Sequence, residues 1–286
     1  MKRTFSVAIL MLFLTIQASS QKTIQKNSFQ VTVAGKGAAI LYFPGFSIGG
    51  SIFQETIDQL DIKGQNHVFT FAGFDGVNPI EMPWYSTIKM DLKTYIQEQE
   101  LGEITIVGHS MGGNLALDLA MELPDQVNKL VIIDALPCMR EVMMPGVPAE
   151  ALQYESPFNN QVLNMKEEGF KGYAYNMASN MTKDSVGVTK ILDWILKADR
   201  KTYVYGYTDL LKIDARPGLE KIKAECLILV APEPYGEDMV LKNINSQYER
   251  LGTKTVKVAP KSRHFIMYDN LPWMINEINL HLNGTD

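Results

Sequence analysis

The sequence contains little cysteine and no excess of positive charge. Two cysteines in 286 residues are too few for a disulfide-stabilised scaffold. A formal net charge of −5 argues against a nucleic-acid-binding protein, which normally carries a basic face or stripe. Internal repeats and low-complexity tracts are also lacking, while hydrophobic residues make up 46% of the chain, too many for a disordered protein. These exclusions leave a globular protein of one large domain, or of one domain with an insertion.

The one long hydrophobic run lies at the N-terminus and has the layout of a secretory signal peptide. Two basic residues open the chain, residues 7–16 are almost entirely apolar, and the small residues Ala18 and Ser20 precede a cleavage point. The run is too short to span a bilayer comfortably, so we expect no stable membrane anchor. We predict a signal peptide at 1–20 and a periplasmic or secreted mature chain at 21–286. Losing two positive charges changes the net charge from −5 to −7.

Export would permit a disulfide bond, but only Cys138 and Cys226 are available. One follows a predicted strand and the other begins one, so the sequence leaves their separation open. Free cysteines often belong to a hydrophobic core, and we expect two buried free thiols.

Short apolar runs alternate with helical patterns along the mature chain. Strands are expected over residues 38–43, 68–71, 103–107, 129–133, 226–230 and 255–258, with an edge strand over 30–33. Helices are expected over residues 51–60, 86–99, 114–123 and 272–282. Strands that are apolar at every position are buried on both faces, as in parallel sheets. The alternation predicts an α/β fold with a mostly parallel central sheet flanked by helices.

The alternation breaks between residues 137 and 216, where helical patterns occur without a convincing buried strand. We expect a helical cap insertion at 137–216 over the C-terminal ends of the strands, where ligands bind in open α/β sheets. The core then consists of residues 21–136 and 217–286. The insertion contains the methionines and aromatic residues Met139, Met143, Met144, Tyr154, Phe158, Met165, Phe170, Tyr173, Tyr175, Met177 and Met181. They could line an adaptable apolar pocket or only hold the cap helices together, and both interpretations stay open.

The sequence Gly108-His109-Ser110-Met111-Gly112 follows a predicted buried strand and precedes a predicted helix. In this context a G-x-S-x-G pattern forms a sharp turn that exposes the serine hydroxyl. The glycines let the turn close without clashes, and the helix N-terminus offers N–H groups that can stabilise an oxyanion. We predict that Ser110 is a nucleophile.

A serine nucleophile needs a base, and the sequence has four histidines. His67 opens a predicted strand and His281 lies in the last predicted helix, so both are expected to be packing or surface residues. His109 lies inside the turn and is expected to shape it. His264 lies in the loop after the final predicted strand, where the last member of the order serine, acid, histidine falls. We predict that His264 takes the Ser110 proton and returns it to the leaving group.

The backbone N–H groups of Met111 and Phe46 are the predicted oxyanion hole. Met111 follows the nucleophile, and Phe46 belongs to the Pro44-Gly45-Phe46 turn after the first buried strand. Because only backbone groups are needed, both side chains are free to line the pocket.

Over nearly the whole mature chain, these segments resemble the α/β-hydrolase superfamily. The resemblance rests on the Pro44-Gly45-Phe46 turn, the turn around Ser110, the His264-Phe265 pair and the closing helix, and it implies the α/β-hydrolase fold. Members usually carry His-Gly at the oxyanion turn, whereas this chain has Pro44-Gly45. Since the donor is a backbone group, this departure does not affect the predicted hole.

The acid of the triad has more than one candidate. Most members of the superfamily place it after the strand that here ends at Val230, but the only acid there before the next helix is Glu233, between two prolines. Glu237 and Asp238 look like the first turn of that helix, which favours acidic residues. Some branches, including haloalkane dehalogenases, place the acid where Asp134 stands. We predict Asp134, with Glu233 as the first alternative and Glu237 or Asp238 after it.

The resemblance implies a serine hydrolase that cleaves a small or medium, partly apolar carboxylic ester, thioester or lactone through an acyl-enzyme on Ser110. Its partners would be a small-molecule acyl substrate and water, with no cofactor, metal or nucleic acid. The same triad also serves C–C bond hydrolysis and cofactor-free perhydrolysis. A non-catalytic ligand-binding or sensing protein of the same fold is the third possibility. Substrate identity and oligomeric state stay open.

Overall fold

The computed structural model describes residues 21–284, so the predicted signal peptide at 1–20 lies outside the described residues. An eight-stranded sheet forms the centre, in the order β1-β2-β4-β3-β5-β6-β7-β8. The strands are β1 (Lys22–Gln25), β2 (Phe29–Gly35), β3 (Ala39–Phe43), β4 (Gln65–Phe71), β5 (Ile104–His109), β6 (Val127–Ile133), β7 (Glu225–Val230) and β8 (Lys254–Val258). Pairing is antiparallel for β1 with β2 and for β2 with β4, and parallel from β4 through β8. The prediction of a mostly parallel sheet is confirmed.

The strands at the centre of the sheet are buried on both faces, as their apolar runs predicted. All five residues of β3 are buried, and their side chains alternate between the two faces of the sheet. Leu41 and Phe43 belong to the hydrophobic core on one face, whereas Ile40 and Tyr42 belong to the core on the other. Two helical layers are therefore needed to cover this sheet.

The prediction that residues 30–33 form an edge strand is wrong. They belong to β2, which pairs with β1 on one side and β4 on the other. The edge is β1, whose residues Lys22, Thr23 and Gln25 are exposed. The sequence of β1 shows neither the alternation of apolar and polar residues nor the apolar run that indicates a strand. An edge strand that buries few side chains requires neither pattern.

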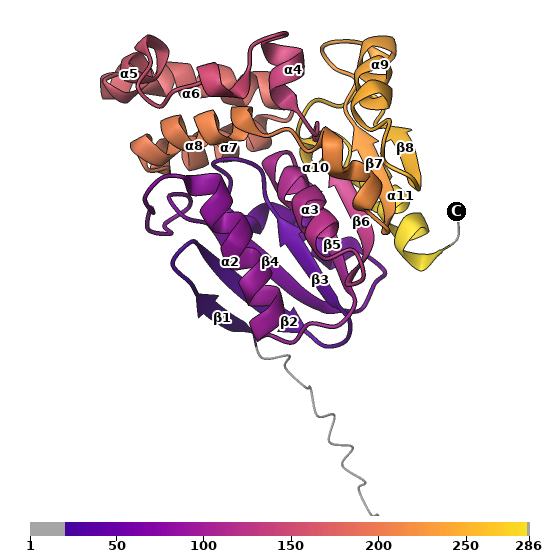
Figure 1. Ribbon diagram of the computed structural model, residues 1–286. Helices are drawn as coiled ribbons and strands as arrows, with labels where there is room; N and C mark the ends of the chain where they lie inside the picture. The colour runs from indigo at the N-terminus through magenta and orange to yellow at the C-terminus, as the bar shows by residue number, and fades with distance from the viewer. Residues whose placement is uncertain (1–20, 285–286) are drawn as a thin grey trace, which may run out of the picture.

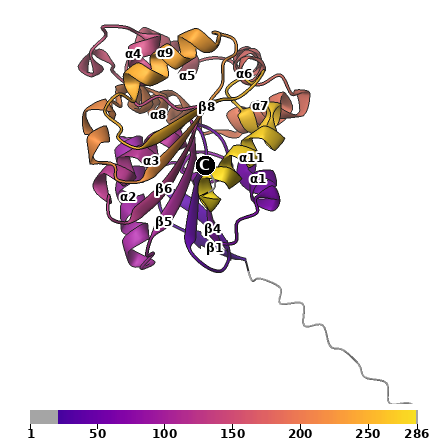
Figure 2. The same ribbon diagram turned by 90° about the vertical axis from the view of Figure 1, so that its right-hand side faces the viewer.

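Helices cover both faces of the sheet, as Figure 2 shows with the sheet between them. One face carries α2 and α3, and the other carries α1 and α11. Their bounds are α1 (Gln54–Gln59), α2 (Trp84–Glu98), α3 (Met111–Glu122) and α11 (Leu271–Asn283), and a 3₁₀ turn at Gly50–Phe53 precedes α1. Two further helices, α9 (Glu237–Gln247) and α10 (Ile266–Asp269), follow β7 and β8. No helix within residues 21–284 is long and apolar enough to cross a membrane.

Five helices connect β6 to β7 and lie over the C-terminal ends of the strands (Figure 1). We call this segment, residues 139–212, the cap. Its helices are α4 (Met139–Met143), α5 (Pro157–Leu163), α6 (Glu167–Met181), α7 (Ser185–Lys197) and α8 (Arg200–Lys212), with 3₁₀ turns at Ala149–Ala151 and, after the cap, Arg216–Lys221. The side chains of Ser156, Asp184 and Asp199 accept N–H groups at the starts of α5, α7 and α8, which fixes where these helices begin.

Both cysteines are buried and neither forms a disulfide. The expectation of two buried free thiols is confirmed. Cys226 lies in β7, where burial holds the pKa of its thiol at about 12, so this group behaves as a small apolar side chain.

Candidate active site

Ser110 stands at the sharp turn between β5 and α3. Its backbone angles are φ 54° and ψ −122°, a combination that L-residues rarely adopt. Neighbouring glycines make the turn possible: a Cβ on Gly108 would lie 2.3 Å from the Gly112 carbonyl oxygen. A Cβ on Gly112 would lie 2.0 Å from the Phe43 carbonyl oxygen. The predicted need for glycine at both positions is confirmed.

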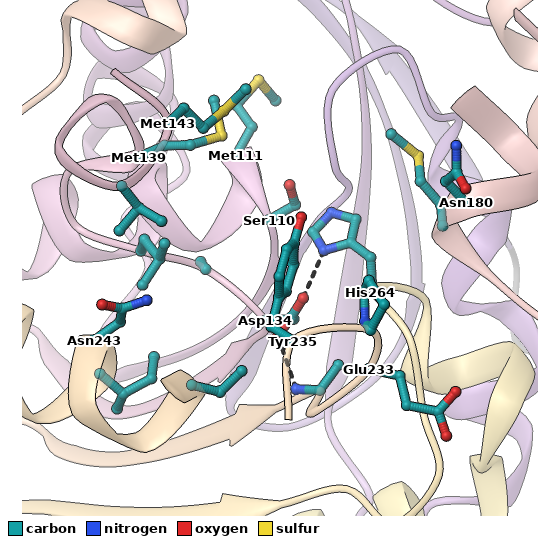
Figure 3. Close-up of a pocket in the computed structure, with 18 of the residues that line it drawn as sticks. Ser110, Met111, Asp134, Met139, Met143, Asn180, Glu233, Tyr235, Asn243 and His264 are labelled. Carbon is teal, nitrogen blue, oxygen red and sulfur yellow. Dashed lines mark hydrogen bonds and ion pairs between the residues drawn. The ribbon is translucent and has the colours of Figure 1, made fainter. Parts of the chain in front are cut away.

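His264 lies in the loop between β8 and α10 and contacts Asp134, which directly follows β6. Its Nδ1 atom is 2.7 Å from Oδ2 of Asp134, as the dashed line in Figure 3 marks. The other carboxylate oxygen of Asp134 accepts the N–H of Ala231 at 2.8 Å. Asp134 has a positive φ of 46°, a conformation that aspartate tolerates better than most residues. Each carboxylate oxygen of Asp134 therefore has a defined partner, one in the His264 loop and one at the end of β7.

Ser110, Asp134 and His264 all line one pocket of about 580 Å³. They come from the ends of β5 and β6 and from the loop after β8, so the sheet brings together residues far apart in the sequence. The described hydrogen bonds include none between Ser110 and His264. Such contacts are often long in an unliganded site and shorten only when substrate binds.

Glu233 also lines this pocket, but its carboxylate has a different partner. It lies 2.9 Å from Nζ of Lys183, which comes from the connection between α6 and α7. In Figure 3 the Glu233 carboxylate points away from His264. Glu237 and Asp238 occupy the exposed first turn of α9, as their pattern predicted. Among the described carboxylates, Asp134 is the one that forms a hydrogen bond with His264.

His109 is fully buried and contacts the His264 loop. Its Nε2 atom donates to the carbonyl oxygen of His264 at 3.0 Å, and the two rings lie 4.7 Å apart between centroids. Burial and the nearby charge of His264 hold the pKa of His109 well below 6.5. A neutral, buried ring suits the predicted structural role. His67 is likewise buried, with its pKa lowered by burial to about 4.

The Pro44-Gly45-Phe46 turn lies directly against Ser110. A Cβ on Gly45 would lie 3.3 Å from Cβ of Ser110 and 2.9 Å from Nδ1 of His109. The Phe46 side chain, which the backbone role left free to line the pocket, is not among the described lining residues. Its ring instead packs against the rings of Phe74, Trp84, Tyr203 and Tyr207. The Phe46 side chain is half-buried in that aromatic cluster, whereas the Met111 side chain does line the pocket.

Four of the six cap methionines line the pocket, and the cap aromatics do not. The lining methionines are Met139 and Met143 from α4, Met177 and Met181 from α6, Met239 from α9, and Met111. Phe170 and Tyr173 pack against each other and belong to the core between cap and sheet. Of the cap residues singled out in the sequence, some methionines therefore line the pocket, whereas Phe170 and Tyr173 hold the cap together.

Several lining residues were not found from the sequence: Asn114, Asn180, Tyr235, Val240, Asn243 and Ile244. Asn180 lies on α6 beside Met177 and Met181, at the spacing of one helix face. Asn243 shares a face of α9 with Met239 in the same way. This periodicity could have grouped each asparagine with its neighbouring methionine on one helix face. It does not indicate which helix faces the pocket.

The charge of the pocket wall is negative. Its ionisable carboxylates are Asp134 and Glu233, and no lysine or arginine occurs among the described lining residues. Lys183 offsets the charge of Glu233 from outside the wall. Such a wall disfavours an anionic group on a bound ligand.

The sequence profile of the alpha/beta hydrolase family matches residues 40–273. Among curated proteins, the chain is 32% identical over 117 residues to a pimeloyl-[acyl-carrier protein] methyl ester esterase of Legionella pneumophila, covering 41% of this chain and 46% of that one. It is 32% identical over 94 residues to an sn-1-specific diacylglycerol lipase of Danio rerio, covering 32% of this chain and 27% of that one. The matched regions span less than half the length of these relatives.

Among solved structures, an esterase from Exiguobacterium antarcticum superposes with a TM-score of 0.72 at 16% identity. The superposition covers 87% of this chain and 93% of the esterase. At this identity the likeness shows the fold alone.

Proposed function

The chain belongs to the alpha/beta hydrolase family, and from that membership we propose that it is a serine hydrolase acting on a small or medium, partly apolar carboxylic ester, thioester or lactone. The observation that carries this proposal is the position of Ser110, His264 and Asp134 around one pocket, with His264 bonded to Asp134 at 2.7 Å. A nucleophile, a base and a group that orients the base are the parts that acyl transfer needs.

In the proposed reaction, Ser110 Oγ attacks the substrate carbonyl and His264 takes its proton. Asp134 holds the His264 ring in place and stabilises its protonated form. The N–H groups of Phe46 and Met111 would bind the oxyanion of the tetrahedral intermediate. His264 then gives the proton to the departing alcohol or thiol, which leaves an acyl group on Ser110. Water, deprotonated by His264, attacks the acyl carbon; the bond to Ser110 Oγ breaks, the acid leaves, and His264 returns its proton to Oγ.

We propose an uncharged, partly apolar acyl group because of the pocket wall. Six methionines line the pocket, including four that the cap contributes. Unbranched thioethers adapt to chains of different shape, and the described wall has no lysine or arginine to pair with a negative group. In this proposal the cap supplies much of the specificity, and no metal or cofactor takes part in the proposed steps.

Nitrophenyl esters test this function on the mature protein. We expect hydrolysis of esters from acetyl to octanoyl. In a pair with acyl chains of equal length, the uncharged butyryl ester should be preferred over the anionic hemisuccinyl ester by about tenfold in kcat/KM. That ratio corresponds to about 1.4 kcal/mol, a modest repulsion in a partly solvated pocket. Lack of turnover of every ester would contradict the ester hydrolase and favour the C–C bond hydrolase or the ligand-binding protein. A preference for the hemisuccinyl ester would contradict only the apolar substrate class.

We also propose that the chain is exported and that its signal peptide is removed before Gln21. The first strand begins at Lys22, so this cleavage would leave every described helix and strand intact. Expression of the full chain in a bacterial host should give a periplasmic or secreted protein. Its intact mass should correspond to residues 21–286. A cytosolic protein that keeps residues 1–20 would contradict the proposal.

A further inference from the structure

The backbone around His264 is held at three consecutive residues. The N–H of Arg263 donates to Oδ2 of Asp269 at 2.7 Å, and the N–H of Phe265 donates to the carbonyl oxygen of Met181 at 3.0 Å. The carbonyl oxygen of His264 accepts from His109 at 3.0 Å. The position of the His264 side chain therefore depends on these neighbours as well as on Asp134.

Asp269, at the end of α10, is bonded to the cap as well as to the His264 loop. Its Oδ1 atom accepts the Thr182 hydroxyl at 2.6 Å and the Lys183 N–H at 2.9 Å. Thr182 is fully buried, so these bonds are shielded from competing water. One carboxylate thus joins the residue before His264 to the end of α6.

The same end of α6 forms part of the pocket wall. Asn180 and Met181 line the pocket, two residues and one residue before Thr182. Arg263 strengthens the connection, since its Nη1 atom donates to the carbonyl oxygen of Ser179 at 2.8 Å. Hydrogen bonds at the C-terminal end of α6 therefore connect the His264 loop to the part of the cap that faces the substrate.

We propose that Asp269 is a positioning residue for His264, and that it keeps the His264 loop aligned with the cap residues that face the substrate. This inference rests on the proposed function, because it assigns Asp269 a role through the base of that reaction. Asp269 bonds the backbone of the neighbouring Arg263, and so acts on catalysis through the placement of the loop. Displacements near one ångström in a catalytic group can lower rates about a hundredfold.

Both oxygens of Asp269 are needed as acceptors for this role. All three of its partners are donors, and a carboxylate accepts on both oxygens. An asparagine has one acceptor oxygen, so its amide nitrogen would face a donor either at Arg263 or at the Thr182–Lys183 end of the cap. Asp269→Asn therefore breaks the link on one side with almost no change in size.

The test compares Asp269→Asn with Asp199→Asn, a matched control in the cap. Asp199 also accepts two hydrogen bonds, at 2.7 Å each from the N–H and hydroxyl of Thr202 in the first turn of α8, but the described bonds of its side chain do not reach the His264 loop. Each variant is titrated with a fluorophosphonate, so that kcat is expressed per reactive serine. We expect Asp269→Asn to lower kcat per site by ten- to a hundredfold, with KM for an acetyl ester within about twofold of wild type. Asp199→Asn should keep wild-type kcat per site even if its melting temperature falls.

Amide hydrogen exchange gives a readout that does not depend on activity. Asp269→Asn should speed exchange at Arg263 and Phe265 relative to wild type and to Asp199→Asn. Wild-type kcat per site in Asp269→Asn, or an equal loss in Asp199→Asn, would overturn the proposal. If wild type hydrolyses no ester, the proposed function fails, and unchanged exchange at residues 263 and 265 would then refute the Asp269 link separately. Should Asp269→Asn fold poorly, Thr182→Ala removes one of its bonds and should give a smaller loss in the same direction.

Discussion

Replacing Ser110 by alanine or glycine is expected to abolish hydrolysis, and the glycine variant should be the more stable of the two. Loss of the nucleophile should lower kcat on the order of 10⁶-fold, as expected when a triad serine is removed. The stability difference follows from the backbone of Ser110, at φ 54° and ψ −122°. Alanine keeps the strain of that conformation, whereas glycine adopts it without a Cβ clash.

The expected gain of Ser110→Gly over Ser110→Ala is about 1 kcal/mol, or roughly 2–4 °C in melting temperature for a chain of this size. Ester turnover, labelling by a fluorophosphonate followed by intact mass, and thermal unfolding measure the three effects. Ser86→Ala, at an exposed position of α2, should label and turn over like wild type. Labelling of Ser110→Ala would contradict the assignment of the nucleophile, and equal stability of the two variants would contradict the strain.

Two of the three proposed triad residues combine positive φ with a place at a strand end. Ser110 and Asp134 follow β5 and β6 directly, at φ 54° and 46°. Each departs from the conformation its strand would continue, and this turns both side chains toward the pocket. Residues in functional sites often adopt backbone conformations that their residue type disfavours. The difference in stability between Ser110→Gly and Ser110→Ala measures the strain of one such conformation.

The parts of the site that sequence could predict are those with a local signature. The turn around Ser110 needs glycine at two positions within five residues, and both requirements are visible in the sequence. His264 could be found because its loop has a fixed place in the order of strands. The long apolar runs of the central strands were equally informative, since only a doubly covered sheet buries them.

Other parts depend on contacts between distant segments and left no local signal. The Phe46 ring packs against Tyr203 and Tyr207 of α8. No periodicity or spacing in the sequence predicts this contact between distant segments. Asn243 enters the pocket wall because α9 presents that face to the site. The edge strand β1 could not be predicted, because its burial is too slight to impose a pattern.

Replacing Asp134 by asparagine should cause the second-largest loss of activity, and the hydrogen bonds of Asp134 explain why. The oxygen that accepts the Ala231 N–H at 2.8 Å would keep that bond as the amide oxygen. The amide nitrogen would then face Nδ1 of His264, the atom now bonded to the carboxylate at 2.7 Å. Because the amide nitrogen only donates, His264 would carry its proton on Nε2 and could not accept the proton of Ser110. We expect kcat to fall about 10⁴-fold.

Glu233→Gln is the matched control, since it makes the same change at the alternative acid. Its carboxylate pairs with Lys183 at a half-exposed position, with 37% of each side chain accessible, and such pairs contribute at most about 1 kcal/mol. We therefore expect kcat within about twofold of wild type. Measurement of kcat on an acetyl nitrophenyl ester decides between the two acids. An active Asp134→Asn with an inactive Glu233→Gln would transfer the role of the acid to Glu233. Activity in both single variants would require that His264 work without an oriented carboxylate, which the bond between His264 and Asp134 gives no reason to expect.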